Sequence, residues 1–210
     1  TTFDGSSLSI ANTIDGAVLG LAITGTSSAD TITGSEGDDT IDLGAGDSKS
    51  DTVNIAFGGA GEDTISNFNA GDTNGDIIDF TGTSDVTGTG ITAGNLQTAD
   101  LANGAVVAAG GMIKVTDANT AALTSSAEIL AALNGTATGS TGNALTLNAA
   151  GDNVFYVAID NGTDTVLAQV DDTAGTTGGT LEAGDITLIG TLSSITDAST
   201  LTAANFADFA

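Results

Sequence analysis

The chain lacks cysteine, histidine, proline and tryptophan, and only two of its 210 residues, Lys49 and Lys114, are basic. Without cysteine there are no disulfides, so an extracellular chain of this kind needs another form of cross-link. The absence of cysteine and histidine excludes zinc, haem and iron–sulfur sites of the usual kinds. No apolar run reaches 18 residues, so we expect no membrane span.

Acidic residues dominate what charge there is. The chain has 27 acidic residues and a net charge of −25, and thirteen of the acids lie between residues 30 and 85. Such a chain repels itself unless cations neutralise it, and it will not bind nucleic acid or anionic lipid directly. Its hydrophobic content of 40% nevertheless separates it from disordered acidic tails. We therefore expect folding to require counter-ions.

Glycine and aspartate recur in a regular pattern between residues 25 and 80. The best unit, residues 58–66, reads GGAGEDTIS and fits the nine-residue pattern G-G-x-G-x-D-x-U-x at every fixed position. An apolar residue follows two places after the aspartate of each unit; the pairs are Asp30 and Ile32, Asp39 and Ile41, Asp51 and Val53, Asp63 and Ile65, and Asp76 and Ile78. The pattern predicts a turn followed by a short strand with one side chain pointing inward.

The residue types of each turn suit calcium. Glycine allows a positive φ and lets carbonyl groups face one point, and the aspartate adds a carboxylate. Calcium is a hard cation that takes six to eight oxygen ligands. Two units make one coil, so each turn stacks on the turn two units later. We expect the ions to lie between stacked turns.

Residues 34–42 and 58–66 resemble the RTX family, the calcium-dependent repeat proteins that bacteria export by type I secretion. The resemblance implies a parallel β-roll with calcium as its cofactor. The implied ligands are Asp30, Gly34, Glu36, Gly37, Asp39, Gly44, Gly46, Asp47, Asp51, Gly58, Gly59, Ala60, Gly61 and Asp63.

The repeat is irregular after residue 39. Asp30 and Asp39 are nine residues apart, but Asp51 and Asp63 each follow after twelve and Asp76 after thirteen. We expect a short, irregular roll. The next segment, residues 67–80, resembles the one that follows the last repeat in many RTX proteins, and Asp72, Asp76 and Asp79 are candidates for a last ion site. Phe68 and Phe80 are predicted to plug the end of the roll or simply to pack in its core.

The sequence divides into two predicted regions. Residues 1–80 form the roll with capping strands at its start, and residues 81–210 form a β-rich region with one or two short helices. Ser125 and Glu128 have the spacing of a capping box, which predicts a helix near 126–133 that ends at Asn134-Gly135. The fold class is therefore mainly β.

Strands are predicted at 110–117, 144–148, 153–160, 165–171 and 185–192, with a hairpin turn at 160–163. The acidic loop between residues 171 and 185 is favoured as a solvated hairpin loop. The alternative is one more calcium site that uses Asp171, Asp172, Glu182 or Asp185.

The last residues, near 196–210, are acidic, lack basic residues and contain Phe206 and Phe209. They resemble the uncleaved export signal of type I secreted proteins, whereas the alternative is an ordinary C-terminal helix. The chain starts at Thr1 without a visible signal peptide, so we expect further protein upstream.

No catalytic constellation stands out, because the acids mostly occupy repeat positions. We expect no enzyme activity. The favoured function is a secreted, calcium-dependent structural domain of S-layer type at the bacterial surface, which self-associates into a lattice. The alternatives are the folding and export module of a secreted enzyme or toxin, and the terminal part of a large RTX adhesin.

Overall fold

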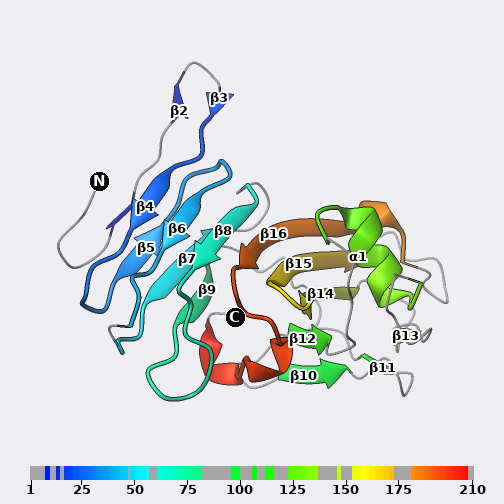
Figure 1. Ribbon diagram of the computed structural model, residues 1–210. Helices are drawn as coiled ribbons and strands as arrows, with labels where there is room; N and C mark the ends of the chain where they lie inside the picture. Colours follow the sequence, from blue (N-terminus) through cyan, green and yellow to red (C-terminus); the bar gives the residue numbers. More distant parts are fainter. Residues whose placement is uncertain are drawn as a thin grey trace. The chain divides into compact units, whose positions relative to one another are not determined.

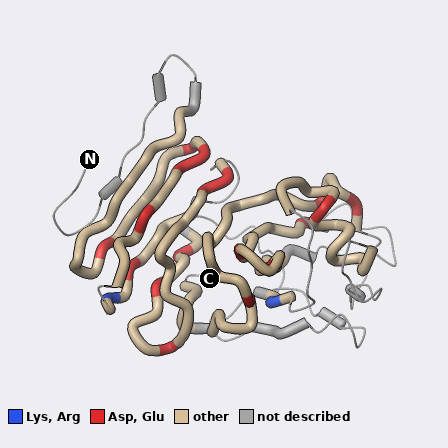
Figure 2. The backbone as a smooth tube through the Cα atoms, viewed as in Figure 1, with Lys and Arg blue, Asp and Glu red and all other residues tan. Residues whose placement is uncertain are grey.

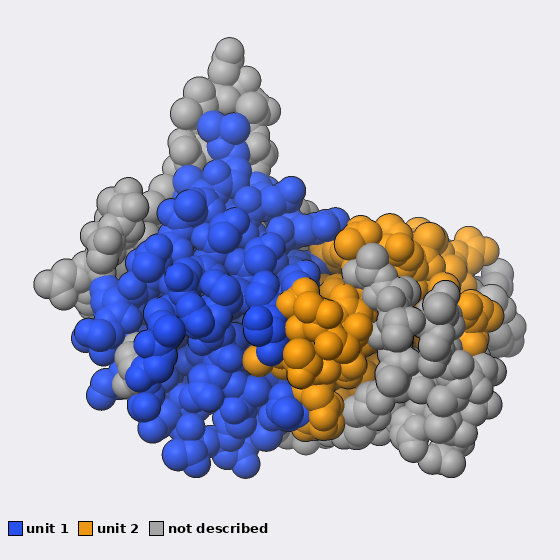
Figure 3. All heavy atoms as spheres, viewed as in Figure 1, with its two compact units in different colours: residues 1–83, 189–194, 200–208 blue, residues 84–188, 195–199, 209–210 orange. Residues whose placement is uncertain are grey.

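The computed structural model describes residues 8–9, 13–14, 17–46, 48–56, 61–81, 96–99, 106–107, 112–115, 123–136, 146–147, 153–172 and 181–207. The chain divides into two compact units (Figure 3). Unit 1 consists of residues 1–83, 189–194 and 200–208, and unit 2 of residues 84–188, 195–199 and 209–210. The sequence predicted one boundary, after residue 80. In the structure two stretches near the C-terminus belong to the first unit.

Unit 1 is built from short parallel strands in two sheets (Figure 1). The chain crosses from one sheet to the other at every turn. The first sheet has the order β1-β5-β7-β9-β17, with β1 Leu8–Ser9, β5 Thr31–Thr33, β7 Thr52–Ala56, β9 Ile77–Thr81 and β17 Phe206–Ala207. In the second sheet β4 (Ala22–Thr24), β6 (Thr40–Asp42), β8 (Asp63–Ser66) and the end of β16 (Ile186–Leu192) pair in that order. This arrangement confirms the predicted parallel β-roll.

The core of the roll comes from the inward-facing apolar residues of its strands. Strand residues alternate between the two faces of a sheet, so the apolar residue of each repeat points inward. These residues are almost fully buried: Ile23, Ile41 and Ile65 from one sheet, and Ile32, Val53 and Ile78 from the other. The longer strands β7 and β9 each add a second buried residue, Ile55 and Phe80. They also pair in register along each sheet, as Ile32 with Val53 and Val53 with Ile78. The apolar residue of each repeat therefore becomes a stack of β-branched side chains.

The end of the roll is closed by aromatic side chains. Phe80 on β9 is buried, and its ring stacks on Phe206 with centroids 6.4 Å apart and planes 11° from parallel. Phe206 is on β17, which pairs with β9 through Phe206–Ile78 and Ala207–Asp79. Phe68, in the turn before β9, is buried as well. The predicted apolar closure at Phe68 and Phe80 is present, and the C-terminal segment completes it.

The early strands join the roll as well. β1 pairs in parallel with β5, through Leu8–Ile32 and Ser9–Thr33. β2 (Thr13–Ile14) and β3 (Ala17–Val18) form a separate antiparallel pair. The first sheet is thus extended by a strand from before the first repeat, as the capping prediction requires.

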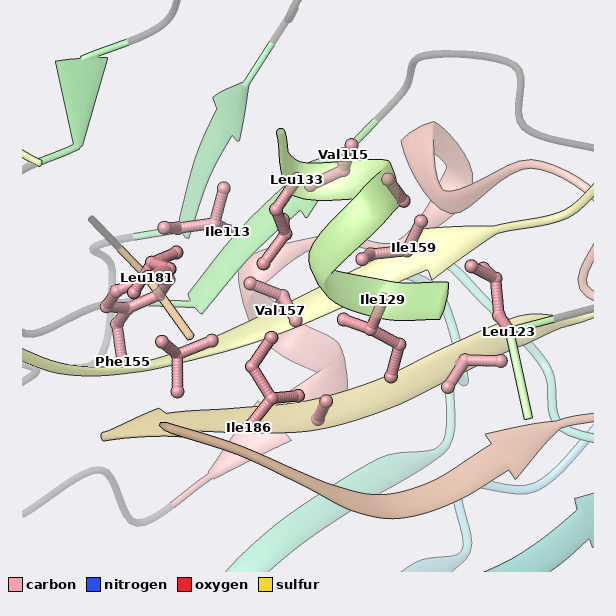
Figure 4. Close-up of a cluster of buried hydrophobic side chains, with 14 residues drawn as sticks. Ile113, Val115, Leu123, Ile129, Leu133, Phe155, Val157, Ile159, Leu181 and Ile186 are labelled. Atoms are coloured by element: carbon pink, nitrogen blue, oxygen red, sulfur yellow. The ribbon is translucent and has the colours of Figure 1, made fainter. Parts of the chain in front are cut away.

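Unit 2 is a mixed sheet with a helix over one face. Its strands β10 (Leu96–Ala99), β12 (Met112–Val115) and β14 (Asn153–Asp160) are parallel, and β15 (Thr165–Asp172) is antiparallel to β14. The helix α1 (Ser126–Leu133) buries Ile129 and Leu133 against side chains of β12 and β14 such as Val157 (Figure 4). Because alternate residues of β12, β14 and β15 supply this cluster, it covers one face of the sheet. Tyr156, Ala158 and Leu167, which point to the other face, are buried as well.

The start of α1 and the turn between β14 and β15 have the local structure that the sequence predicted. Ser125 caps α1: its Oγ accepts the Glu128 backbone N–H, while Glu128 Oε2 accepts the Ser125 hydroxyl. At the β14–β15 hairpin, Asn161 Oδ1 accepts the N–H groups of Thr163 and Asp164, and Gly162 has a positive φ of 81°. These contacts confirm the helix start and the hairpin turn.

The remaining described strands are short. β13 (Thr146–Leu147) lies within the strand predicted at 144–148, whose other residues are outside the described ranges, and it pairs with β11 (Val106–Val107). No pattern predicted β10 or β11, because short strands in Gly/Thr/Ala-rich sequence have little alternation to detect. No helix in the described part of the chain is long and apolar enough to cross a membrane.

Candidate metal centre

The aspartates of the repeat lie in two columns, one along each edge of the roll. Asp30, Asp51 and Asp76 stand at the starts of β5, β7 and β9, and Asp39 and Asp63 at the starts of β6 and β8. All five are at most 8% exposed. Figure 2 shows the acidic residues of the roll gathered at the turns between strands. The sequence repeat therefore places one buried carboxylate per turn.

Each column is linked by hydrogen bonds from one aspartate to the next. The Asp30 N–H donates to Asp51 Oδ1 (2.8 Å), and the Asp51 N–H donates to Asp76 Oδ1 (2.9 Å). In the other column the Asp39 N–H donates to Asp63 Oδ1 at 3.0 Å. Charge-assisted bonds of this type are stronger than neutral ones. The carboxylates therefore hold successive coils in register besides offering charge.

The second oxygen of an aspartate closes its own turn. Asp30 Oδ2 accepts the Thr26 N–H at 2.5 Å, Asp39 Oδ2 accepts the Ser35 N–H at 2.5 Å, and Asp76 Oδ2 accepts the Asn69 N–H at 2.7 Å. A carboxylate has about four lone-pair positions. Asp39 Oδ1 also accepts the Leu21 N–H and the Ser35 hydroxyl, so a cation would share carboxylate oxygens with the hydrogen bonds that fix the turns.

Glycine is required where successive turns stack. A Cβ on Gly25 would lie 2.9 Å from Asp30 Oδ2 and 3.0 Å from the Leu43 carbonyl oxygen. A Cβ on Gly34 would meet the Asp39 carboxylate, and one on Gly61 would meet Asp38. Gly44 has a φ of 92°, in the region that favours glycine. The missing side chains let carbonyl and carboxylate oxygens of neighbouring turns approach one another.

The electrostatics of the second column favour a cation. Burial raises the pKa of Asp63 from 3.8 to about 7, against the lowering effect of the Asp39 N–H bond; the charges of Asp39 and Asp38 raise it further. The only basic residue within residues 1–83 is Lys49. A bound cation would favour the charged form of Asp63. The site thus holds more negative charge than its own protein groups balance.

The donor set fits calcium. The stacked turns offer main-chain carbonyls, such as those of Thr26 and Leu43, together with carboxylates, and all of these are hard oxygen ligands. Within the described ranges no point gathers three acidic side chains. Carbonyl oxygens must therefore complete any coordination shell, which is what the glycine-dependent close approach provides.

The structure places the predicted ligands as follows. The repeat aspartates Asp30, Asp39, Asp51, Asp63 and Asp76 form the two columns, whereas Glu36 and Asp72 are exposed at their turns and Asp79 lies within β9. Gly34, Gly37, Gly44, Gly46 and Gly61 lie in the turns. The predicted ligands Asp47, Gly58, Gly59 and Ala60 lie outside the described residues.

The acidic loop after β15 gives no second cluster among its described residues. Asp171 and Asp172 end β15, while Asp185 Oδ2 accepts the Glu182 N–H and caps the short 3-10 helix η2 (Ala183–Asp185). Calcium binding there stays a prediction.

Sequence reasoning missed Asp38, whose Oδ1 accepts the Glu62 N–H at 2.9 Å across the stack. The adjacent Asp38-Asp39 pair was the available signal. It also missed Asn205, which reaches the last turn of the roll from a place 129 residues beyond Asp76.

Comparison with known families gives one result that bears on this site. Residues 22–48 match the model of the RTX calcium-binding nonapeptide repeat (4 copies). No curated protein and no solved structure gave a significant match to the chain. The matched residues include the first turns of both aspartate columns, with their stacked glycines. The chain therefore contains RTX calcium-binding repeats at residues 22–48, and calcium is the cation that these repeats bind.

Proposed function

We propose that this chain is a calcium-dependent structural domain of an exported bacterial surface protein. The observation that carries the proposal is the pair of buried aspartate columns in a chain of net charge −25. Without cations these columns repel one another and the roll is unstable, and calcium removes that repulsion. The domain therefore folds where calcium is abundant. Inside a bacterium, where free calcium is scarce, it stays unfolded and can pass through a narrow type I exporter.

Outside the cell, calcium supplies the free energy of folding. A ligand that binds only the folded state stabilises it by about 2.7 kcal/mol per site at a hundredfold excess over Kd. Two such sites would contribute about 5 kcal/mol, which is comparable to the whole stability of a typical domain. The folded chain then serves as a component of an S-layer type lattice. We further propose that it catalyses no reaction.

Self-assembly is tested by electron microscopy and sedimentation of the purified chain in calcium, in magnesium and in chelator. A two-dimensional lattice that forms only with calcium is the expected result. A folded monomer in calcium at every protein concentration would contradict the surface-lattice proposal and favour the folding and export module of a larger secreted protein.

Export is tested separately, in a bacterial host that carries a type I secretion apparatus. Deletion of residues 196–210 is expected to abolish appearance of the chain in the medium while it accumulates in the cell. The amount of protein must be measured both in the medium and in the cells. Residues 200–208 are also part of unit 1, so a deletion variant that is exported would be less stable in the medium. Export of the deletion variant at the level of the intact chain would refute the C-terminal signal.

A further inference from the structure

Asn205 is fully buried although its side chain is an uncharged amide on a segment of little regular structure. It ends the short 3-10 helix η4 (Ala203–Asn205), immediately before β17. Its side chain reaches into the last turn of the roll, residues 67–76. A buried amide is tolerated when both of its ends find partners, and this one finds them on both ends.

The amide nitrogen of Asn205 faces three carbonyl oxygens of that turn. The distances from Nδ2 are 2.8 Å to the Asp76 oxygen, 3.3 Å to the Gly71 oxygen and 3.4 Å to the Asn69 oxygen. Oδ1 accepts the Gly71 N–H at 3.0 Å and the Thr202 N–H at 2.9 Å. Main-chain groups of the turn therefore contact both the nitrogen and the oxygen of the Asn205 amide.

The backbone of the turn is shaped for this side chain. A Cβ on Gly75 would lie 2.8 Å from Asn205 Nδ2 and would also meet the Gly71 carbonyl oxygen. Gly71 itself has a φ of 116°. Both glycines thus permit a convergence of carbonyls around the amide that other residues would prevent.

Converging main-chain carbonyls are the feature by which a repeat turn holds calcium. In the last turn, the converging carbonyl oxygens surround the Asn205 amide nitrogen instead. Its two N–H groups are the positive end of the side-chain amide dipole. We propose that the Asn205 carboxamide replaces an ion in the last turn, so that residues 67–76 take no calcium. The roll ends with a protein group in the position of the final cation. In this arrangement Asp72, Asp76 and Asp79, which the sequence offered as a last ion site, do not form one.

The proposal rests on calcium-dependent folding, and it assigns Asn205 a role in setting the number of ions. Replacing the amide by a carboxylate of the same shape reverses the charge presented to the three carbonyls. The variant Asn205→Asp should then need a cation at this point, and it has the all-oxygen ligand set to hold one. We expect one more bound calcium per chain than in the unaltered protein, and a higher calcium concentration at the midpoint of folding.

The measurement is the number of calcium ions per folded chain, by calorimetric titration and by metal analysis after dialysis. Asn161→Asp is the matched control, because Asn161 Oδ1 accepts the N–H groups of Thr163 and Asp164 in the hairpin of unit 2 and a carboxylate can do the same. This control should leave the number of ions unchanged. Asn205→Ala, which removes the donors, should lower the folding equilibrium constant at fixed calcium by roughly tenfold.

An unchanged ion count in Asn205→Asp would overturn the proposal. So would failure of that variant to fold at saturating calcium, because the turn would then not accept a cation in place of the amide. An unaltered chain that binds no calcium would instead refute calcium-dependent folding itself. The two failures are therefore distinguishable.

Discussion

At the scale of single residues, each repeat aspartate combines two roles. Its carboxylate accepts N–H groups that fix the coil, as Asp63 does from Asp39, and its charge attracts the cation. An amide of the same shape can retain the first role but not the second. Substitution by asparagine therefore separates the hydrogen bond from the charge.

We expect Asp63→Asn to lower calcium affinity by more than tenfold, because one buried charge is lost while the Asp39 N–H still finds an acceptor. Asp63→Ala should lose more stability, since that N–H is then left without its partner. Calorimetric titration with calcium measures the affinity, and Asp172→Asn at the end of β15 is the control that removes one charge outside the roll. Equal losses in Asp63→Asn and Asp172→Asn would contradict the role of the column.

Asp160 gives a prediction about pH in unit 2. It is buried at the end of β14, where desolvation raises its pKa above 3.8; the N–H bond from Ala198 opposes this and the charge of Asp197 adds to it. The charge of Asp197 also acts on Lys114. The folded state therefore binds the Asp160 proton more tightly than the unfolded state does.

The sign follows from linkage: this group favours folding increasingly as pH falls through its raised pKa, and the gain stops below its ordinary pKa of 3.8. In Asp160→Asn that gain is absent. We expect the variant to be most stable relative to the unaltered chain at pH 7, with the difference shrinking toward pH 4. Urea unfolding at saturating calcium across this range measures it, and a constant difference would contradict the assignment.

At the scale of elements, α1 depends on its first turn. Its N-cap Ser125 exchanges hydrogen bonds with Glu128, and the helix has only eight residues. Short helices are marginal without packing and caps. Removal of the cap should therefore measurably lower the stability of unit 2.

We expect Ser125→Ala to lower the free energy of unfolding by about 1 kcal/mol. Thr163→Ala is the control, because that exposed residue contributes its backbone N–H rather than its side chain to the hairpin. Urea unfolding followed by far-ultraviolet circular dichroism measures both variants. The cap would be unimportant if the two variants lost the same amount.

β17 is the second element whose contribution can be tested. Phe206 packs on Phe80 and pairs with Ile78 of β9, so it covers the end of the roll. We expect Phe206→Ala to cost about 3 to 5 kcal/mol, the usual range for a buried phenylalanine. Phe206→Leu keeps the apolar volume but not the ring stacking and should cost clearly less. Urea unfolding of the two variants at saturating calcium measures these losses. An unchanged free energy of unfolding in Phe206→Ala would show that β17 does not close the roll.

At the scale of the whole molecule, the proposed function makes folding depend on charge. With a net charge of −25 and two lysines, we expect the repeat columns to require external cations. Magnesium demands a small octahedral shell and releases its waters reluctantly, so carbonyl-rich turns suit it poorly.

We therefore expect millimolar calcium to fold the roll and equal magnesium to fail, as measured by circular dichroism and by hydrogen exchange of the repeat strands. Matched ionic strength in sodium chloride controls for simple screening. A roll that is fully protected from exchange in chelator would contradict the requirement for calcium.

Local sequence determined much of this protein. The spacing of glycine, aspartate and β-branched residues specifies turns, short strands and buried carboxylates within each unit, since each depends on neighbours a few residues away. Ser125, Glu128 and Gly135 define α1 for the same reason. Asp38 was missed although its signal is local, because its partner Glu62 lies in the next coil.

Tertiary structure decided what closes the roll. Asn205 and Phe206 contact β9 and the turn before it across about 130 residues of chain, and no periodicity in the sequence connects these positions. The same holds for β16, whose Gly190 pairs with Asp63 and adds a strand to the repeat sheet from outside the repeats. A repeat pattern reports contacts between neighbouring coils. The last coil has no following neighbour, so its partners depend on where the distant C-terminal segment packs.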